Sequence, residues 1–306
     1  MPSPVALATD RRWLVSENAR NIHKIDIRLD RVGDEQRVLL MSDVHWDNPK
    51  CDWALLKKHL TEARDYDAPV IDNGDFFDCM GGKWDKRANK SDLRPEHQNA
   101  HYLDSLVTTA ADFLKPWQDL LTVRGQGNHE TSILKHHETN LTDRLVERLR
   151  AQGAASIALG GYSGYIVFIT SNAGRIKPYK LHYHHGHGGG GAVTRGVIQT
   201  NRHAVYLADA DLVFTGHTHD SWKVPIARVK LNADCTILEH TRQEHVSAPG
   251  YKEEYGDGYA GWHVERGAPP KPTGAWWLIF KVTGCRKASP SAKPQPLVEY
   301  DLVEAK

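Results

Sequence analysis

Four short apolar runs, each followed at once by a polar, Gly-containing or His-containing motif, constrain the fold of this chain more than any other feature. They are residues 38–41 before SDVH, 69–71 before DNGD, 120–123 before RGQGNH, and 212–214 before TGHTH. Short continuous apolar runs are typical of strands that are buried on both faces of a parallel sheet. Ligands bind beyond the carboxyl ends of such strands, so the polar residues at these ends predict a functional site.

Helix-like stretches alternate with these runs, and the alternation predicts an α/β layered fold. The predicted helices cover residues 52–64, 96–113, 140–152 and 193–208. The remaining predicted strands are a short one at 22–29, two hairpins within 165–185 and 223–246, and two closing strands at 276–282 and 297–303.

Composition narrows the class of protein. The 306 residues carry 39 Lys and Arg against 38 Asp and Glu, a net charge of +1, and 40% of them are hydrophobic. These values are near the average for soluble globular proteins and exclude collagen-like, coiled-coil and disordered chains. The near-zero charge argues against a nucleic-acid binder held by bulk electrostatics, although it is compatible with a local basic groove.

The sequence carries no sign of membrane insertion or secretion. No apolar run reaches 18 residues, so neither a transmembrane helix nor a membrane partner is expected. The segment MPSPVALATDRRW has no basic region ahead of an apolar core, which a secretory signal would have. Four cysteines without a CxxC pair favour reduced thiols in a cytoplasmic protein. The oligomeric state is left open.

Two pairs of polar residues have a spacing that brings side chains together. Asp43 and His45 are two residues apart, and on an extended backbone both side chains leave the same face. His217 and His219, in GHTH, have the same spacing. Each pair is therefore expected to direct its side chains to one side of the chain.

Two further motifs place carboxylates, an amide and an imidazole at strand ends. Asp75 and Asp78 lie in GDFFD, and Asn128 and His129 lie in GNHE. Glu130, the last residue of GNHE, is expected to be solvated or to cap a following helix.

The stretch LHYHHGHGGGG at 181–191 supplies a fifth motif. Alternation along a strand places His182 and His184 on one face and His185 on the other, directly before a Gly turn. His185 is therefore the preferred candidate, with His187 as its rival. Each motif is weak alone, but five of them in order at strand ends are improbable as a structural coincidence.

The order DxH, GDxxD, GNH[DE], HG and GHxH resembles that of the calcineurin-like metallophosphoesterase superfamily, the binuclear metal phosphoesterases. The resemblance covers about 38–219. It implies a four-layer α/β fold, in which a central β-sandwich of mixed sheets is flanked by helices and two metals lie at one edge. We predict a single domain of this kind over 1–306, in which the strands and the aromatic, Gly-rich loop of 220–306 complete the sandwich and could cap the site.

The resemblance also implies roles for the candidate residues. The first metal would be bound by Asp43, His45 and His219. The second would be bound by Asn128, His185 and His217, with Asp75 as the bridge between the two. The catalytic histidine would be His129, with the Asp78 carboxylate as its partner.

The chemistry of these residue types agrees with such a centre. Mixed nitrogen and oxygen donors without thiolate differ from a structural zinc site. They suit two divalent ions, with manganese as the first choice and iron, zinc, nickel or cobalt as alternatives. Two such ions about 3.5–4 Å apart can share a hydroxide and stabilise an in-line phosphoryl displacement. His129, which is not needed as a ligand, is free to protonate the leaving oxygen, and Asp78 would fix its tautomer.

The substrate class depends on weaker signals. Cys79 follows GDFFD where serine/threonine protein phosphatases of this superfamily carry Arg, whereas the GNHE ending matches theirs. We therefore expect a phosphodiesterase that acts on nucleic-acid or nucleotide-type phosphodiesters through the bridging hydroxide. A phosphomonoesterase or protein phosphatase is the alternative. A non-catalytic scaffold of the same fold is the alternative from another class, and it is disfavoured because every family position is filled.

Basic and aromatic side chains near the motifs are candidates for substrate binding, although each could equally be ordinary surface or core. The basic candidates are Lys83, Arg87, Arg195 and Arg202. The aromatic, Gly-rich segment 250–274 could supply stacking platforms, form a lid or pack on the sheet. The expected partner is thus a phosphoester, with nucleic acid among the candidates.

Overall fold

The structure is a computed structural model that describes residues 11–81, 93–172, 175–188, 194, 196–232, 234–256, 258–259, 262–287, 291 and 295–306. Three of the basic residues predicted to bind substrate, Lys83, Arg87 and Arg195, lie outside the described residues. Arg202 is described and is exposed on a helix.

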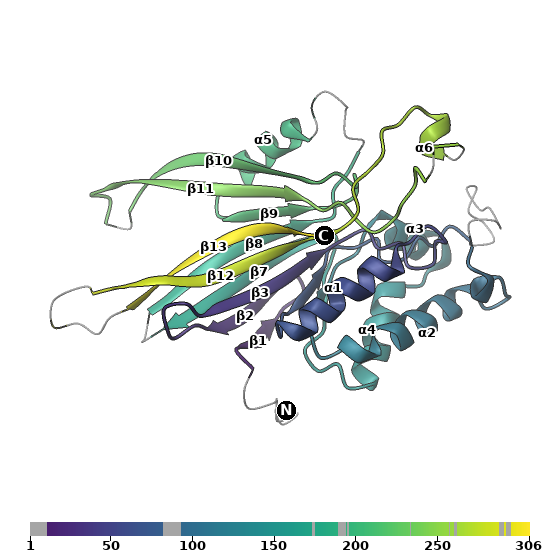
Figure 1. Ribbon diagram of the computed structural model, residues 1–306, viewed down its shortest axis with the longest axis horizontal. Helices are drawn as coiled ribbons and strands as arrows, with labels where there is room; N and C mark the ends of the chain where they lie inside the picture. Colours follow the sequence, from purple (N-terminus) through teal and green to yellow (C-terminus); the bar gives the residue numbers. More distant parts are fainter. Residues whose placement is uncertain are drawn as a thin grey trace.

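Two mixed β-sheets form the centre of the molecule (Figure 1). The seven-stranded sheet has the order β1-β2-β7-β8-β9-β11-β10. Its strands are β1 (Trp13–Asn18), β2 (Ile22–Arg28), β7 (Ser163–Asn172), β8 (Arg175–His184), β9 (Leu212–Thr215), β10 (Trp222–Leu231) and β11 (Leu238–Ser247).

The six-stranded sheet has the order β13-β12-β3-β4-β5-β6. Its strands are β3 (Glu35–Met41), β4 (Val70–Asp72), β5 (Leu121–Arg124), β6 (Ala158–Leu159), β12 (Ala275–Arg286) and β13 (Gln295–Ala305). Strands β3 to β6 run parallel, whereas β12 joins β3 and β13 in antiparallel pairs.

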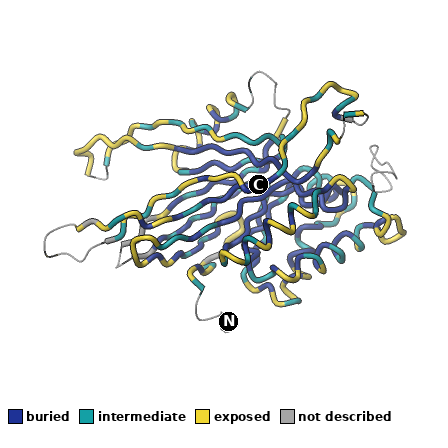
Figure 2. The backbone as a smooth tube through the Cα atoms, viewed as in Figure 1, coloured by how far each residue is buried: buried dark blue, intermediate teal, exposed yellow. Residues whose placement is uncertain are grey.

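The sheets pack on each other through aromatic side chains. Phe280 of β12 lies 5.2 Å from Phe168 of β7 and 5.4 Å from Tyr179 of β8, measured between ring centroids. One continuous cluster of buried residues draws on both sheets, and burial is greatest where the sheets meet (Figure 2).

Helices lie outside both sheets. The helices α1 (Trp53–Asp65), α2 (Tyr102–Leu114), α3 (Asn128–His137) and α4 (Leu141–Ala151) lie on the side of the six-stranded sheet, and α5 (Val197–Tyr206) lies against β10 (Figure 1). The short α6 (Trp262–Glu265) lies in the segment between β11 and β12. The predicted α/β fold of mixed sheets flanked by helices is confirmed.

The four apolar runs are divided between the sheets. Three of them become β3, β4 and β5 of the six-stranded sheet, and the fourth becomes β9, which is parallel to β8 and β11 in the other sheet. The carboxyl ends of strands from both sheets therefore contribute to one edge of the sandwich.

Several element boundaries differ from those predicted. The helix expected at 96–113 is a 3-10 turn at Pro95–His97 followed by α2. The break has a local cause, because the Asn99 side chain accepts a hydrogen bond from the His101 backbone N–H at 2.8 Å. A helix was expected after Glu130 without a stated range, and it is α3, whereas the edge strand β1 was not predicted.

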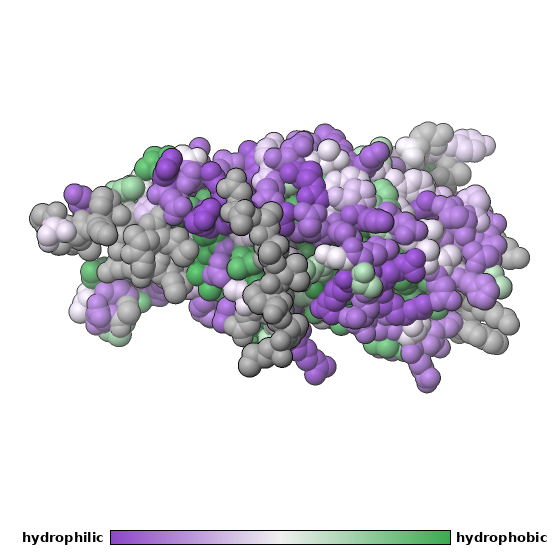
Figure 3. All heavy atoms as spheres, turned by 90° about the horizontal axis from the view of Figure 1, so that it is seen from below, coloured by the Kyte–Doolittle hydropathy of each residue, from purple (hydrophilic) through white to green (hydrophobic). Residues whose placement is uncertain are grey.

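The surface is mostly polar away from the sheets. The face seen in Figure 3 is largely hydrophilic, with apolar residues in separate groups. The β10–β11 hairpin extends as an exposed ribbon on which Val229, Leu231, Ile237 and Leu238 are each more than half exposed (Figure 2). In the part of the chain that the structure describes, no helix has both the length and the apolar character that crossing a bilayer requires.

Candidate metal centre

The predicted ligands converge at one edge of the sandwich. Loops after β3, β4 and β5 of one sheet meet loops after β8 and β9 of the other, so residues far apart in sequence become neighbours. Among the described residues, three sets of side-chain ligand atoms lie within 4.8 Å of one another: Asp43 with His45 and His219, Asp75 with His185 and His217, and His45 with Asp78 and His129.

The first set matches the group expected for the first metal. His219 Nε2 lies 3.2 Å from His45 Nε2 and 3.4 Å from Asp43 Oδ1. Asp43 and His45 are buried, whereas the His219 side chain is 16% exposed, which leaves this set accessible from one side.

The second set consists of Asp75 and two of the residues expected for the second metal, His185 and His217. The third expected residue, Asn128, lies beside them. His185 Nε2 lies 3.1 Å from Asp75 Oδ2 and 3.2 Å from Asn128 Oδ1. His217 Nδ1 lies 2.7 Å from the same Asn128 oxygen. His187, the rival of His185, belongs to none of the three sets and is exposed. The bridging role of Asp75 stays a prediction.

The hydrogen bonds of His185 show that the second set fits a cation. Its Nδ1 lies 3.0 Å from the Asn73 backbone oxygen, so Nδ1 carries the hydrogen. In the neutral imidazole, Nε2 is then an acceptor that faces two further acceptors, the Asp75 carboxylate and the Asn128 carbonyl. Three facing acceptors require a positive charge, which either a proton or a divalent ion can supply.

The pKa of His185 reflects this excess of negative charge. Burial alone would lower it, but the carboxylates of Asp75 and Asp43 outweigh burial and raise the pKa to about 10. The pKa of Asp43 is shifted in the opposite direction. Burial would raise it, but the nearby imidazoles of His185 and His219 lower it to about 2.

His45 in the first set differs, because it is prepared as a neutral ligand. Its Nδ1 lies 2.8 Å from Asp78 Oδ1, which accepts the ring hydrogen and leaves the Nε2 lone pair turned to His219. Burial lowers the pKa of His45 to about 4, against the opposing effect of the Asp78 carboxylate.

The backbone at the predicted ligands is unusual. Asp43, His45, Asp75, His217 and His219 have φ of 54°, 50°, 50°, 71° and 52°. Positive φ is uncommon outside glycine and costs about 1–3 kcal/mol per residue, and it is concentrated at functional sites. The two i, i+2 pairs were expected to direct their side chains to one side because their backbone is extended. That reason is wrong, since all four residues have the left-handed backbone conformation.

Asp78 plays a different part from the one expected of it. The carboxylate, predicted to orient His129, is hydrogen-bonded to His45 and lies 4.0 Å from His129 Nδ1. His129 Nδ1 instead donates to the Asp78 backbone oxygen at 2.5 Å. The orientation of His129 is therefore fixed by the main chain of residue 78.

Lys252 is a site residue that the sequence analysis missed. Its Nζ lies 3.2 Å from Asp78 Oδ1 and 2.6 Å from Glu254 Oε1, and its side chain is 9% exposed. It lies in the segment 250–274, for which only the aromatic residues were predicted to have a role. Of those, Tyr251 is buried and its hydroxyl lies 2.9 Å from His59 Nδ1, whereas Tyr259 is 90% exposed.

Two acidic residues support the loops that carry the ligands. Glu130 accepts hydrogen bonds from the backbone N–H groups of Gly127, Asp75 and Phe77 at 2.8, 3.0 and 3.0 Å. Its expected role as a helix cap is confirmed, and the solvated alternative is wrong because the residue is buried. Asp47 is buried and its carboxylate accepts hydrogen bonds from the backbone N–H groups of residues 78 and 79.

Glycines in the motifs allow the backbone to approach the carboxylates. A Cβ on Gly127 would lie 1.9 Å from Asp75 Oδ1, and one on Gly216 would lie 2.4 Å from Asp43 Oδ2. Any side chain at these positions would displace a predicted ligand, which explains the Gly of GNH and of GHTH in physical terms.

Comparison with known proteins assigns no family to this chain. No family model matches the chain, and no curated protein matches its sequence. Among solved structures, the chain is similar to a conserved uncharacterized protein from Streptococcus pneumoniae described as a predicted phosphoesterase, with 11% identity, a TM-score of 0.32 and coverage of 89% of this chain and 91% of that one.

A second similar structure is Vps29 from Entamoeba histolytica, complexed with zinc. The identity is 10% and the TM-score 0.33, over 89% of this chain and 100% of that one. Both similarities are too weak to assign a role to any residue. The structure itself shows two mixed sheets flanked by helices and three His and Asp sets that could hold metal ions.

Proposed function

We propose that this protein is a binuclear metallophosphoesterase that hydrolyses phosphodiesters of the nucleic-acid or nucleotide type. The observation that carries the proposal is the pair of His and Asp sets at one edge of the sandwich, with His129 beside them and not required as a ligand. A structural metal site would have no use for such a histidine.

The chain's own residues would hold two divalent ions, with manganese as the first choice. Asp43, His45 and His219 would bind one ion, and Asn128, His185 and His217 would bind the other, with Asp75 between them. Once bound, the ions would polarise the phosphoryl group and activate water for in-line attack. The donor set, which combines imidazoles, carboxylates and an amide oxygen, suits this chemistry.

His129 is proposed as the proton donor to the leaving oxygen. Its Nδ1 is occupied by the Asp78 backbone oxygen, so Nε2 is the nitrogen available for transfer. Burial would lower the pKa of His129, but the carboxylates of Asp75 and Asp78 raise it above its usual value. The side chain is 12% exposed, so it reaches the accessible side of the centre.

The preference for diesters is supported by the residue that follows GDFFD. Cys79 is buried there, so this position offers no cation to bind a doubly charged monoester. Turnover of a phosphodiester, a phosphomonoester, single-stranded DNA and a phosphopeptide with added manganese tests the proposal. We expect the diester and the DNA to be cleaved, whereas turnover of only the monoester or the phosphopeptide would contradict the substrate class.

Metal analysis of the purified protein separates this proposal from a non-catalytic scaffold. An enzyme should contain, or take up, about two divalent ions per chain and hydrolyse a diester. Scarcely any bound metal, together with no hydrolysis after metals are added, would favour the scaffold.

A further inference from the structure

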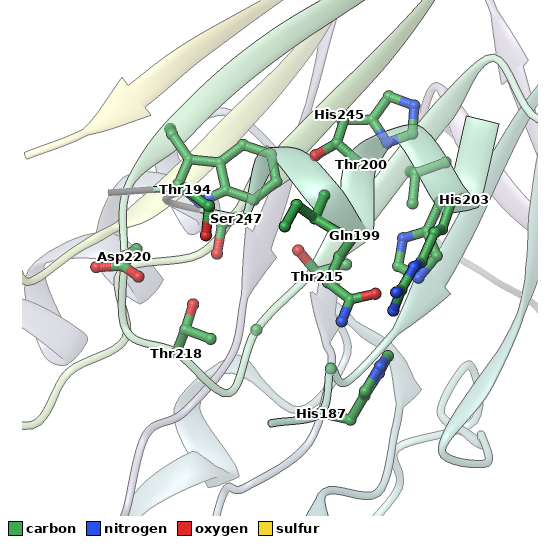
Figure 4. A pocket seen from close by; sticks show the side chains of 17 residues that line it. His187, Thr194, Gln199, Thr200, His203, Thr215, Thr218, Asp220, His245 and Ser247 are labelled. Carbon is green, nitrogen blue, oxygen red and sulfur yellow. The ribbon is translucent and has the colours of Figure 1, made fainter. Parts of the chain in front are cut away.

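A pocket of about 280 Å³ lies beside the metal centre, between α5 and strands β9, β10 and β11 (Figure 4). Gly186, Gly216 and Thr218 form part of its wall, and each is adjacent in sequence to a predicted metal ligand. Thr218 lies between His217 and His219, whose side chains belong to the metal sets. The loops that carry the predicted ligands are therefore shared by the two sites.

Two imidazoles of the pocket, those of His203 and His245, are neutral hydrogen-bonding groups. Burial lowers the pKa of His203, and it lowers the pKa of His245 to about 4. The Gln243 amide nitrogen donates hydrogen bonds to the backbone oxygens of Leu207 and Ala210. Its Oε1 is therefore the atom that accepts a hydrogen bond from His245 Nε2, at 3.0 Å. The other ring nitrogen of His245 is then an acceptor.

The charged side chains that line the pocket are few, and they do not form a binding site for an ion. Asp220, at one end, is paired with Lys271 Nζ at 2.6 Å. Among the described residues that line the pocket, Arg202 is the only Lys or Arg, and it is exposed. Neither a phosphate group nor a metal ion would find a matching set of charges here.

Two buried hydroxyls of the lining are unpaired. Thr200 and Ser247 are each 1% exposed, and within the described part of the chain their side-chain oxygens have no hydrogen-bond partner. An unpaired buried hydroxyl destabilises the protein, so a ligand that bonds to it gains affinity. Figure 4 labels Thr215, Thr218 and Ser247 among the residues that line the pocket, and the Thr215 hydroxyl donates to the Val246 backbone oxygen at 3.1 Å.

The rest of the lining is apolar and aromatic. Trp222, Ile198 and Val213 contribute to the walls, and Gly196 lies against the Trp222 ring, because a Cβ there would be 2.7 Å from a ring carbon. An indole in the wall can stack on a flat ring, while hydroxyls, imidazoles and the Gln199 amide can bond to the polar edge of that ring. A plain acyl chain would leave these polar groups unpaired.

We propose that this pocket binds the base of a nucleotide-type substrate, an uncharged, planar ring with hydrogen-bonding edges. The proposal rests on the proposed function and deepens it, because it names the group that is recognised while the phosphoryl group lies at the metal centre. Specificity then comes from a site that is built mainly of α5, β9, β11 and the start of β10, and that shares Gly186, Gly216 and Thr218 with the motifs of the predicted ligands.

Two esters with one leaving group test this proposal. p-Nitrophenyl thymidylate carries a base, and the p-nitrophenyl ester of 1,2-dideoxyribose 5-phosphate carries the sugar without the base, so the ratio of their kcat/KM values reports base recognition alone. The wild-type protein should prefer the thymidylate. Ile198→Trp, which adds bulk to a half-exposed pocket residue, should lower the ratio about tenfold, within the range that base stacking provides.

Val197→Trp is the matched control, because Val197 is the neighbouring residue on α5, is similarly exposed, and does not line the pocket. It should leave the ratio unchanged. Gln199→Ala is a second pocket variant without added bulk, and it should lower the ratio by a few-fold. Equal kcat/KM for both esters in the wild type, or equal shifts in the two Trp variants, would overturn the proposal.

Failure of the proposed function is distinguishable from failure of the pocket. If neither ester is hydrolysed, the proposed function fails, and calorimetric binding of thymidine to the protein decides on the pocket by itself. Binding that Ile198→Trp weakens and Val197→Trp leaves intact supports the pocket, whereas no thymidine binding by the wild type contradicts it.

Discussion

The two metal sets hold their imidazoles in different ways. In the first set, His45 Nδ1 is bound to the Asp78 carboxylate at 2.8 Å, and Lys252 contacts the same carboxylate oxygen at 3.2 Å. In the second set, His185 Nδ1 is bound to the backbone oxygen of Asn73 at 3.0 Å. One set therefore depends on side chains that a substitution can remove, and the other depends on the main chain.

The difference extends to protonation. Burial lowers the pKa of His45 to about 4, whereas the carboxylates of Asp75 and Asp43 overcome burial and raise the pKa of His185 to about 10. At neutral pH the first set offers a free lone pair, and the second set must lose a proton before it can bind a metal. The same residue types thus give two sites with different responses to pH and to substitution.

The largest effect is expected from Asp75→Asn, which removes a carboxylate from the second set. Metal bound by this set should be lost, and kcat/KM should fall by about 10³-fold or more, because catalysis needs both ions. Metal analysis and diester kinetics measure both effects. Asp209→Asn, which removes a carboxylate that is 76% exposed on the surface, should change neither. A full metal content with a normal rate in Asp75→Asn would contradict the assignment.

His129→Asn should reduce turnover without affecting either set. Removal of a general acid costs about 10²–10⁴-fold in rate, and His129 is not needed to hold a metal. Metal content should equal that of the wild type while kcat falls. An unchanged rate would remove the acid role from this residue.

Asp78→Asn tests the dependence of the first set on a side chain. The loss of the carboxylate charge behind His45 should weaken metal binding at this set about 10–100-fold. The second set, held by the main chain, should keep its affinity, and calorimetric metal titration separates the two. Equal weakening of both sets would show that the distinction between them is wrong.

The smallest effect is in proton release. Metal uptake by the second set should release about one proton from His185 at pH 7, because its pKa is raised to about 10. The affinity of the second set for the metal should therefore fall up to tenfold for each pH unit below pH 7. Uptake by His45 should release none above about pH 4. Titrations in two buffers of different ionisation enthalpy measure the release, and equal release from both sets would contradict the pKa difference.

Local sequence was sufficient to locate four of the five motifs because each of these four follows a short buried strand, whereas the fifth begins within the ten-residue strand β8. The runs that become β3, β4, β5 and β9 were recognisable from their continuous hydrophobicity. Their division between two sheets was not encoded in any single run. It follows from pairings such as that of β9 with β8 and β11, which depend on the whole fold.

The supporting residues could not be predicted in this way. Lys252 reaches Asp78 across 174 residues of sequence because the chain returns beside Cys51, where Lys252 forms an isolated bridge. Asp72 forms a buried ion pair with Arg124 at 2.8 Å, although 52 residues separate them in the sequence. Such partners are set by tertiary structure, as are the positive φ angles of the predicted ligands.

Anomalous X-ray diffraction from crystals grown with manganese tests the central claim most directly. The account predicts two anomalous peaks at the edge shared by the sheets, one among Asp43, His45 and His219 and the other among Asp75, Asn128, His185 and His217. The absence of both peaks, or peaks only elsewhere, such as at His187 and His203, would contradict it.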